Sequence, residues 1–464
     1  MVGLRNNIVP RIMLLMLFIG LIAFTFKFDV KPVKAWNGTV YIKADGSIDP
    51  SNAPIQRDGN IYTLTGNITS DVDGIVIERD NILINGAGYT LQGMDSGDGI
   101  YLLGRNNVTI KNIEIKGFSS GISLWSSSNN TIVANNITEC EFGVWLGGVV
   151  VMNTLNNIVR NNLKYNDYAI SIAGSSNYIV LNNIRNSIHG IIIDSGTSNS
   201  IVTNNIAINE WYGIKLEDSY NNTIFRNSIG SSFRGICLYS SSNNTIFCNN
   251  VWDGVQLYSS SNNSFYHNNF GGISQTFESV ALWDNGYPSG GNYWSYLWGG
   301  YTRVDEKCGP NQNQPGSDGI CDAEYAIDAN NTDRYPFMAP VNIFEAGIWN
   351  ETEYYIDVVS NSTVSDFYFN PDEGAFLRFN VTGEDGTSGF CRVTIPKDLL
   401  WVEDGQWNIL VGNETVSYTT IPDEDCTYLY FAYNHTTKKV LIQGTDVIPE
   451  FPSGITLLLS LIHI

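Results

Sequence analysis

A short unit repeats from residue 74 to about residue 270 of the chain. A small residue followed by aliphatic-x-aliphatic begins each copy, at Gly74, Gly99, Gly121, Gly143, Ala169, Gly190, Gly213, Gly235 and Gly254. The copies lie 19 to 26 residues apart, and each holds two or three strand-like runs separated by Gly, Ser and Asn. Units this short cannot bury their own apolar face, so they must stack. The units lack the Leu spacing of a leucine-rich-repeat solenoid, and they are too short for the four-stranded blades of a β-propeller. The repeat therefore predicts a right-handed parallel β-helix.

Paired asparagines recur between these strands, as in "NNTIFCNNV" at residues 243–251. Asn tolerates the left-handed backbone of tight turns, and stacked amides can bond from rung to rung. We expect an internal amide ladder of Asn136, Asn162, Asn183, Asn205 and Asn250. Turn chemistry then accounts for part of the glycosylation sequons, and sugar attachment stays open at Asn129, Asn221, Asn243, Asn262, Asn361 and Asn413.

Five segments follow from the changes in pattern. Residues 1–35 read as a signal peptide, with Arg5 and Arg11 before an apolar run. Residues 36–280 form the β-helix with its N-terminal cap, and 281–340 an irregular cap rich in Asp, Gly and aromatic residues. Residues 341–446 carry about seven strand-like runs and predict a small antiparallel β-sandwich. Residues 447–464 form a sorting tail. The expected fold class is all-β.

The charge balance restricts the partners. The chain has 46 acidic and 25 basic residues, a formal net charge of −21. Such a surface repels phosphate backbones and anionic membranes, so nucleic acid is not expected as a partner. Export permits disulfides, and we expect Cys308–Cys321 and Cys391–Cys426, with Cys140, Cys237 and Cys248 as buried thiols.

Two longer motifs follow the repeat: "WDNGYPSGGNYWS" from residue 283 and "SDGICDAEYAIDANNTDRYPFM" from residue 317. With the rungs, they make residues 36–340 resemble the NosD-like β-helix family, named for a periplasmic copper-maturation factor of nitrous oxide reductase. The tail "IPEFPSG" is similar to the PEF-type sorting signal of archaeal surface proteins, although its apolar run is too short to span a bilayer. These resemblances imply an exported cell-surface protein, with membrane attachment at the C-terminus as one possibility and copper maturation as one alternative function.

One side of the predicted rod gathers aromatic and charged residues. Stacking the rungs places Trp125, Trp145, Tyr239 and Tyr258 on the side that carries Asp194, Lys215 and Glu217. Aromatic rings with nearby carboxylates suit a carbohydrate or other cell-envelope polymer. Asp194 and Glu217 on adjacent rungs could also flank a glycosidic bond, with Lys215 as a lyase base. We favour a non-catalytic carbohydrate-binding or envelope component over a polysaccharide hydrolase or lyase, because isolated acids are common on solvated surfaces.

Five aspartates concentrate in the predicted cap: Asp305, Asp318, Asp322, Asp328 and Asp333. Calcium accepts many oxygen ligands in tolerant geometry, so a structural calcium site is expected there, with hydrogen-bonded Asx turns as the alternative. The spacing is not that of an EF-hand. Copper sites favour His, Met and Cys, and the four histidines, His189, His267, His435 and His463, are too scattered to predict one.

Overall fold

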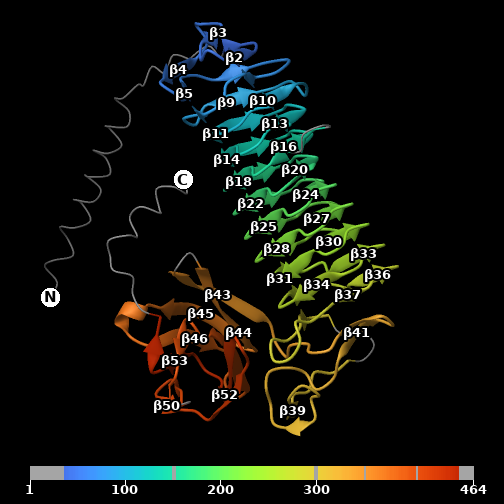
Figure 1. Ribbon diagram of the computed structural model, residues 1–464, viewed down its shortest axis with the longest axis vertical. Coiled ribbons are helices and arrows are strands. Elements are labelled where there is room, and N and C mark those ends of the chain that lie inside the picture. The colour runs from blue at the N-terminus through green and yellow to red at the C-terminus, as the bar shows by residue number, and fades with distance from the viewer. Residues whose placement is uncertain (1–35, 149–152, 297–300, 350–351, 404–405, 449–464) are drawn as a thin grey trace, which may run out of the picture.

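A parallel β-helix and a β-sandwich make up the protein (Figure 1). The computed structural model describes residues 36–148, 153–296, 301–349, 352–403 and 406–448. The predicted signal peptide and most of the predicted tail lie outside these ranges. Within them, no helix is long and apolar enough to cross a membrane. The predicted all-β class is confirmed.

Three sheets, each of twelve strands in the described residues, run the length of the rod. The first sheet contains β1 (Trp36–Asn37), β6 (Ile68–Thr69), β9 (Thr90–Gln92), β12 (Glu114–Lys116), β15 (Asn136–Thr138), β19 (Asn162–Lys164), β23 (Asn183–Arg185), β26 (Asn205–Ala207), β29 (Ser228–Gly230), β32 (Asn250–Val251), β35 (Asn269–Phe270) and β38 (Tyr293–Trp294). The second contains β3 (Ile48–Asp49), β2 (Val40–Ile42), β7 (Ile75–Ile77), β10 (Asp98–Leu103), β13 (Ser120–Trp125), β16 (Phe142–Gly147), β20 (Tyr168–Ile172), β24 (His189–Asp194), β27 (Tyr212–Glu217), β30 (Arg234–Tyr239), β33 (Val255–Tyr258) and β36 (Gln275–Phe277). The third contains β4 (Ile55–Asp58), β5 (Ile61–Leu64), β8 (Ile82–Asn85), β11 (Val108–Lys111), β14 (Thr131–Val133), β18 (Asn157–Val159), β22 (Tyr178–Val180), β25 (Ser200–Val202), β28 (Thr223–Phe225), β31 (Thr245–Phe247), β34 (Asn263–Tyr266) and β37 (Ala281–Leu282).

The rod core consists of columns of like side chains. In the second sheet Ile191, Ile214 and Ile236 pair in register, and all three are fully buried. The small residue that starts each unit lies where adjacent rungs approach closely: a Cβ on Gly143 would meet the Ala169 carbonyl oxygen at 2.5 Å. Aromatic side chains close the C-terminal end of this core: Phe265, Phe270, Trp283, Trp294 and Tyr325. At the other end, the antiparallel pairs β2–β3 and β4–β5 end the stack.

Two buried asparagine ladders run through the turns of the rod. One contains Asn130, Asn156, Asn177, Asn199, Asn222, Asn244 and Asn263, and the other Asn135, Asn161, Asn182, Asn204, Asn227, Asn249, Asn268 and Asn292. Each amide donates to the next rung and accepts from the one before, so the side chains are satisfied inside the rod. The predicted column also forms a ladder, as in Asn162 Nδ2 to Asn136 Oδ1 at 2.6 Å. That ladder lies on the outer face of the first sheet and not inside, which corrects the prediction.

The sequon asparagines of the rod serve as left-handed turn residues. Asn129, Asn221, Asn243 and Asn262 have φ between 56° and 58°. All four are exposed, as are Asn361 and Asn413 in the sandwich. Turn geometry therefore explains these asparagines, and their exposure leaves glycosylation open.

Between rod and sandwich in the sequence, the described residues 301–340 form a cap with two small hairpins. These are β39 (Lys307–Cys308) with β40 (Gln314–Pro315), and β41 (Tyr325–Asp328) with β42 (Asn331–Asp333). A further parallel pair, β17 (Asn153–Thr154) with β21 (Gly174–Ser175), lies on the side of the rod.

The sandwich consists of two five-stranded antiparallel sheets in the described residues. One contains β43 (Val341–Trp349), β44 (Thr352–Ser360), β47 (Ser388–Pro396), β52 (Cys426–Asn434) and β51 (Tyr418–Pro422). The other contains β45 (Thr363–Phe369), β46 (Phe376–Thr382), β53 (Lys438–Gln443), β49 (Asn408–Val411) and β50 (Glu414–Thr415). The short pair β48 (Leu400–Trp401) with β54 (Asp446–Val447) and a 3₁₀ turn at Pro371–Glu373 complete it.

Neither predicted disulfide is formed, and the described cysteines are free thiols. On the paired strands β47 and β52, Cys391 lies opposite Phe431, and Cys426 lies opposite Pro396. Five residues of extended chain separate the two positions, roughly 17 Å, which is far beyond disulfide reach. Cys321 is buried against Met338 instead of Cys308.

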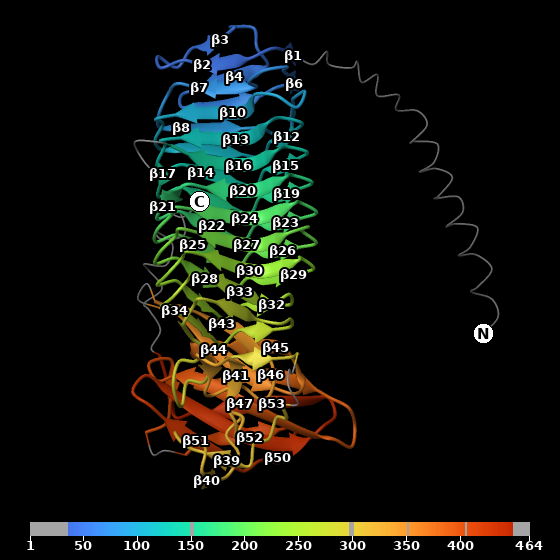
Figure 2. The same ribbon diagram turned by 90° about the vertical axis from the view of Figure 1, so that its right-hand side faces the viewer.

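The sandwich packs against the turns at the C-terminal end of the rod (Figures 1 and 2). Asn269 exchanges two hydrogen bonds with the main chain of Val341, both 2.8 Å long. Tyr355 on β44 contacts the Phe225 ring and the Arg226 guanidinium. The outer face of the second sheet is turned away from this contact, toward the viewer in Figure 2.

Candidate binding face and interdomain cavities

The predicted site residues on the outer face of the second sheet fall into two groups. Asp194 lies opposite Glu217, which lies opposite Tyr239 on the next strand. Tyr258 follows in the same column, and its ring stacks on Tyr239 at 4.5 Å. Trp125 and Trp145 contact each other at 4.8 Å, but they lie on β13 and β16, nearer the N-terminal end. The predicted residues therefore lie on one sheet, and the two tryptophans belong to a separate part of its outer face.

A second aromatic column on this face was missed in the sequence. Phe142, Tyr168, His189 and Tyr212 occupy successive rungs, with ring centroids 4.9, 4.7 and 5.3 Å apart. They immediately precede the small residue of each unit, so the signal was present in the repeat. Between the two columns lie Ser123, Ile192 and Cys237, which are buried, and the burial of the Cys237 thiol agrees with the prediction.

Two cations bridge the aromatic columns. Lys215 forms an ion pair with Glu217, with Nζ 2.6 Å from Oε2, and lies 5.0 Å from the Tyr239 ring. The Arg234 guanidinium donates to the Tyr212 hydroxyl at 2.9 Å and lies 5.1 Å from the Phe233 ring. Charge and aromatic rings therefore meet over β27, β30 and β33.

The rings of this face stack on one another rather than standing apart. Tyr239 and Tyr258 are nearly parallel at 3°, and Tyr258 and Phe277 at 8°. Neighbouring rings therefore cover each other's faces, and ring edges and hydroxyls form the accessible surface. Such a surface can form a row of hydrogen bonds to a ligand, but it has few free ring faces on which a sugar ring could stack.

The Asp194–Glu217 pair has the right rung spacing but separate partners. Asp194 accepts a hydrogen bond from the Ser195 hydroxyl at 2.9 Å, while Glu217 is held by Lys215. A glycosidase requires one protonated and one free carboxylate facing the same bond. The ion pair leaves Glu217 poorly placed for the first role.

A carboxyl group with shifted acidity lies further up the same face. Burial raises the pKa of Asp98 to about 6, and the neighbouring Asp73 adds to this, while a hydrogen bond from Ser120 opposes it. Asp98 begins β10, in the same column as Ser120 and Phe142. We did not predict a role for Asp98 from the sequence, because it precedes the small residue Gly99 and lies outside the aliphatic-x-aliphatic pattern.

The five cap aspartates hold the cap together through hydrogen bonds. Asp305 accepts from the main-chain N–H groups of Asp318 and Gly319, and Asp322 from those of Glu306 and Lys307. Fully buried Asp333 accepts from Asn292 and from the Trp294 indole, and burial raises its pKa to about 7. In the described part of the chain these aspartates do not form a metal-binding group of three. Asp318, Asp328 and Asp333 each also accept from the main-chain N–H two residues further on, which is the geometry of an Asx turn, and the calcium site stays a prediction.

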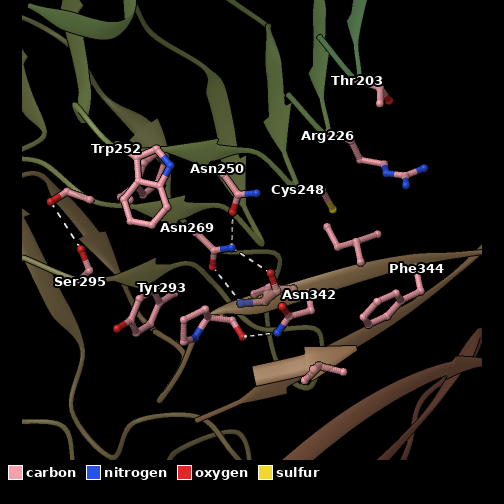
Figure 3. A pocket seen from close by; sticks show the side chains of 16 residues that line it. Thr203, Arg226, Cys248, Asn250, Trp252, Asn269, Tyr293, Ser295, Asn342 and Phe344 are labelled. Atoms are coloured by element: carbon pink, nitrogen blue, oxygen red, sulfur yellow. Dashed lines mark hydrogen bonds between the residues drawn. The ribbon is translucent and has the colours of Figure 1, made fainter. Parts of the chain in front are cut away.

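Two cavities lie between rod and sandwich. The first, of about 490 Å³, has Trp252 and Tyr293 on one side and Arg226 and Phe344 on the other (Figure 3). The second, of about 650 Å³, is lined in part by His267, Asp357 and the acidic turn at residues 423–425. Cys248 lines both. Burial raises the pKa of its thiol well above the ordinary value, and Asp357 adds to this.

The repeat and the first of the two motifs that follow it match a known family. Residues 74–299 match the NosD family, described as periplasmic copper-binding protein. This confirms the resemblance inferred from the rungs. A NosD-type rod agrees with an exported protein, since the family is periplasmic. None of the curated proteins compared with the chain matches it.

Solved β-helix structures show low similarity to this chain. The periplasmic alginate epimerase AlgG is 13% identical, with 53% of this chain and 80% of that chain covered and a TM-score of 0.35. The A-module of mannuronan C-5 epimerase AlgE4 from Azotobacter vinelandii is 15% identical (51% and 74% covered, TM-score 0.35). The DFA-IIIase from Arthrobacter chlorophenolicus A6 is 12% identical (49% and 69% covered, TM-score 0.34). Values this low say nothing about a shared activity.

Proposed function

We propose that this exported NosD-type protein binds a carbohydrate polymer, without catalysis, along the outer face of the second sheet. The observation that carries the proposal is the pair of aromatic columns bridged by Lys215 and Arg234. Their tyrosine hydroxyls and ring edges form an open, repeating surface in which rungs follow at about 4.8 Å. An extended chain of hydroxyl-bearing units fits such a surface.

The charges on this face favour a neutral polymer. Lys215 is already paired with Glu217, and the chain as a whole carries a net charge of −21, which opposes acidic polysaccharides. Arg234 is held between tyrosine hydroxyls, where it can share hydrogen bonds with sugar hydroxyls. Non-catalytic binding is favoured because Asp194 and Glu217 have separate partners.

Binding to a panel of neutral and uronic-acid polysaccharides tests the proposal, with Arg234→Gln and Tyr212→Phe as variants. We expect binding to a neutral polysaccharide that weakens about tenfold or more in Arg234→Gln, the loss of roughly one charge-assisted hydrogen bond. Lys164→Gln, on the outer face of the first sheet, is the matched control and should bind as wild type. Equal binding by Arg234→Gln and wild type, or none to any polysaccharide, would refute the proposal.

A turnover assay separates binding from catalysis. We expect no new reducing or unsaturated ends from any polysaccharide that binds. Product formed by the wild type and lost in Glu217→Gln would show an enzyme and overturn the non-catalytic assignment.

Copper maturation, suggested by the family description, has less support on this face. The described histidines, His189, His267 and His435, lie far apart on β24, after β34 and after β52. No two of them share a metal-binding group in the described residues.

A further inference from the structure

Three side chains with metal-binding atoms meet where the rod contacts the sandwich. Cys248 and His267 follow β31 and β34 at the same turn of successive rungs, where the Cys248 N–H donates to the Tyr266 carbonyl at 3.2 Å. Asp357 comes from β44 of the sandwich. Their ligand atoms all lie within 4.8 Å of one another, and they form the one such group found in the described residues.

The hydrogen bonds of His267 determine which ring nitrogen faces the group. Nε2 lies 3.0 Å from the main-chain carbonyl oxygen of Ser289 and 3.1 Å from the hydroxyl oxygen of the same residue. Nδ1 lies 3.2 Å from Asp357 Oδ2. With Nε2–H donated to the Ser289 carbonyl, the Nδ1 lone pair faces the Asp357 carboxylate, as it does where both groups hold one metal ion.

This arrangement is the usual one for a metal-ligating histidine. Such a residue donates its second ring N–H to a carbonyl or carboxylate, which fixes the tautomer and orients the ring. Nitrogen and oxygen ligands about 2.1 Å from a tetrahedral ion lie roughly 3.4 Å apart, close to the observed 3.2 Å. The carbonyl that orients the His267 ring and a suitable distance between the His267 and Asp357 ligand atoms are thus both present.

The donor set indicates the class of ion. A thiolate excludes calcium and magnesium, which take oxygen ligands, and a carboxylate is a poor ligand for copper(I). Cysteine, histidine and aspartate together suit zinc, which binds all three. The acidic turn at residues 423–425 lines the same cavity and favours a cation there.

We propose that Cys248, His267 and Asp357 bind one divalent ion of the zinc class, with a fourth position open to the cavity. Two ligands come from the rod and one from the sandwich, so the ion links the two domains. The site is independent of the carbohydrate-binding face, which lies on a different sheet.

Cobalt(II) reconstitution of the full chain tests the site, because cobalt(II) reports thiolate ligation through a near-ultraviolet charge-transfer band. We expect one equivalent of cobalt(II) to give this band and zinc to displace it. Cys248→Ser should abolish the band, and Asp357→Asn and His267→Gln should each weaken binding at least about tenfold, the lower end of what losing even an outer-shell partner costs.

One variant serves as a control. Cys308→Ser removes a half-exposed thiol in the cap and should leave the band unchanged. The proposal is overturned if wild-type protein shows no thiolate band, if Cys248→Ser retains it, or if copper(I) binds through Cys248 while zinc does not.

Discussion

Replacing Asn204 by alanine should destabilise the rod far more than replacing its neighbour Asn205. Asn204 Nδ2 donates to Ile179 O at 2.8 Å, Val202 O at 3.1 Å and Asn227 Oδ1 at 3.0 Å. Its Oδ1 accepts from the Asn182 N–H at 2.9 Å and from Asn182 Nδ2 at 3.0 Å. The substitution therefore removes five hydrogen bonds from a side chain that is 1% exposed.

The cost follows from what is left behind. Asn182 loses the acceptor of its main-chain N–H in the rod interior, and a buried unsatisfied donor costs about 1–3 kcal/mol. The other lost bonds and the cavity add to this, so we expect about 3–5 kcal/mol in total. Asn205 is exposed and makes one amide bond, to Asn183 at 3.1 Å, so Asn205→Ala should cost less than about 0.5 kcal/mol.

Urea unfolding of wild type and both variants, followed by circular dichroism, gives the two differences. Amide hydrogen exchange should show the loss of protection in Asn204→Ala centred on the rungs of Asn182 and Asn227. Equal unfolding midpoints for the two variants would refute the reasoning, because they differ only in whether the amide lies inside or outside the rod.

Two further predictions concern the ends of the rod. The pKa of Asp98 in the folded protein is about 6, above the 3.8 of an unperturbed aspartate, so ionisation of Asp98 destabilises the fold as the pH rises through that window. Asp98→Asn should therefore stabilise the protein by about 1 kcal/mol at pH 8, a value discounted for partial exposure, and should have no effect near pH 3. Thermal unfolding at both pH values measures the difference. The Trp283 side chain is 1% exposed and lies between Phe265 and Trp294, so Trp283→Ala should lower the free energy of unfolding by about 3–5 kcal/mol. The Trp252 side chain is 63% exposed, so Trp252→Ala should change it by less than about 0.5 kcal/mol in the same urea assay.

The rod could be predicted because its physics repeats. Each small residue, such as Gly143, lies where two rungs approach, and each following aliphatic pair points inward, so one unit describes all. The error over the asparagine ladder came from register. In pairs such as Asn204-Asn205 the first residue points in and the second out, whereas in pairs such as Asn243-Asn244 the order is reversed. The inward residue cannot be identified without the turn geometry.

The sites were harder to predict because they depend on contacts outside the repeat. The aromatic column that contains Tyr212 could have been detected in the sequence. That Cys237 is buried beside this column could not, because that burial depends on how the side chains pack. Cys248 and His267 align in the repeat, 19 residues apart, whereas Asp357 belongs to the other domain. The disulfide prediction failed because strand register placed Cys391 and Cys426 apart.

The buried asparagine ladders have a direction. Every amide donates toward the C-terminal rung, from Asn135 to Asn292, where the last Nδ2 turns to the carbonyls of Phe265 and Trp283. Any interior rung therefore presents the same acceptor to the rung before it and the same donor to the rung after it. A whole rung can be duplicated or lost without a mismatch, while the terminal rungs cannot be exchanged. Rod length is thus free to evolve in steps of one unit, and the distance between its two ends changes by about 4.8 Å with each step.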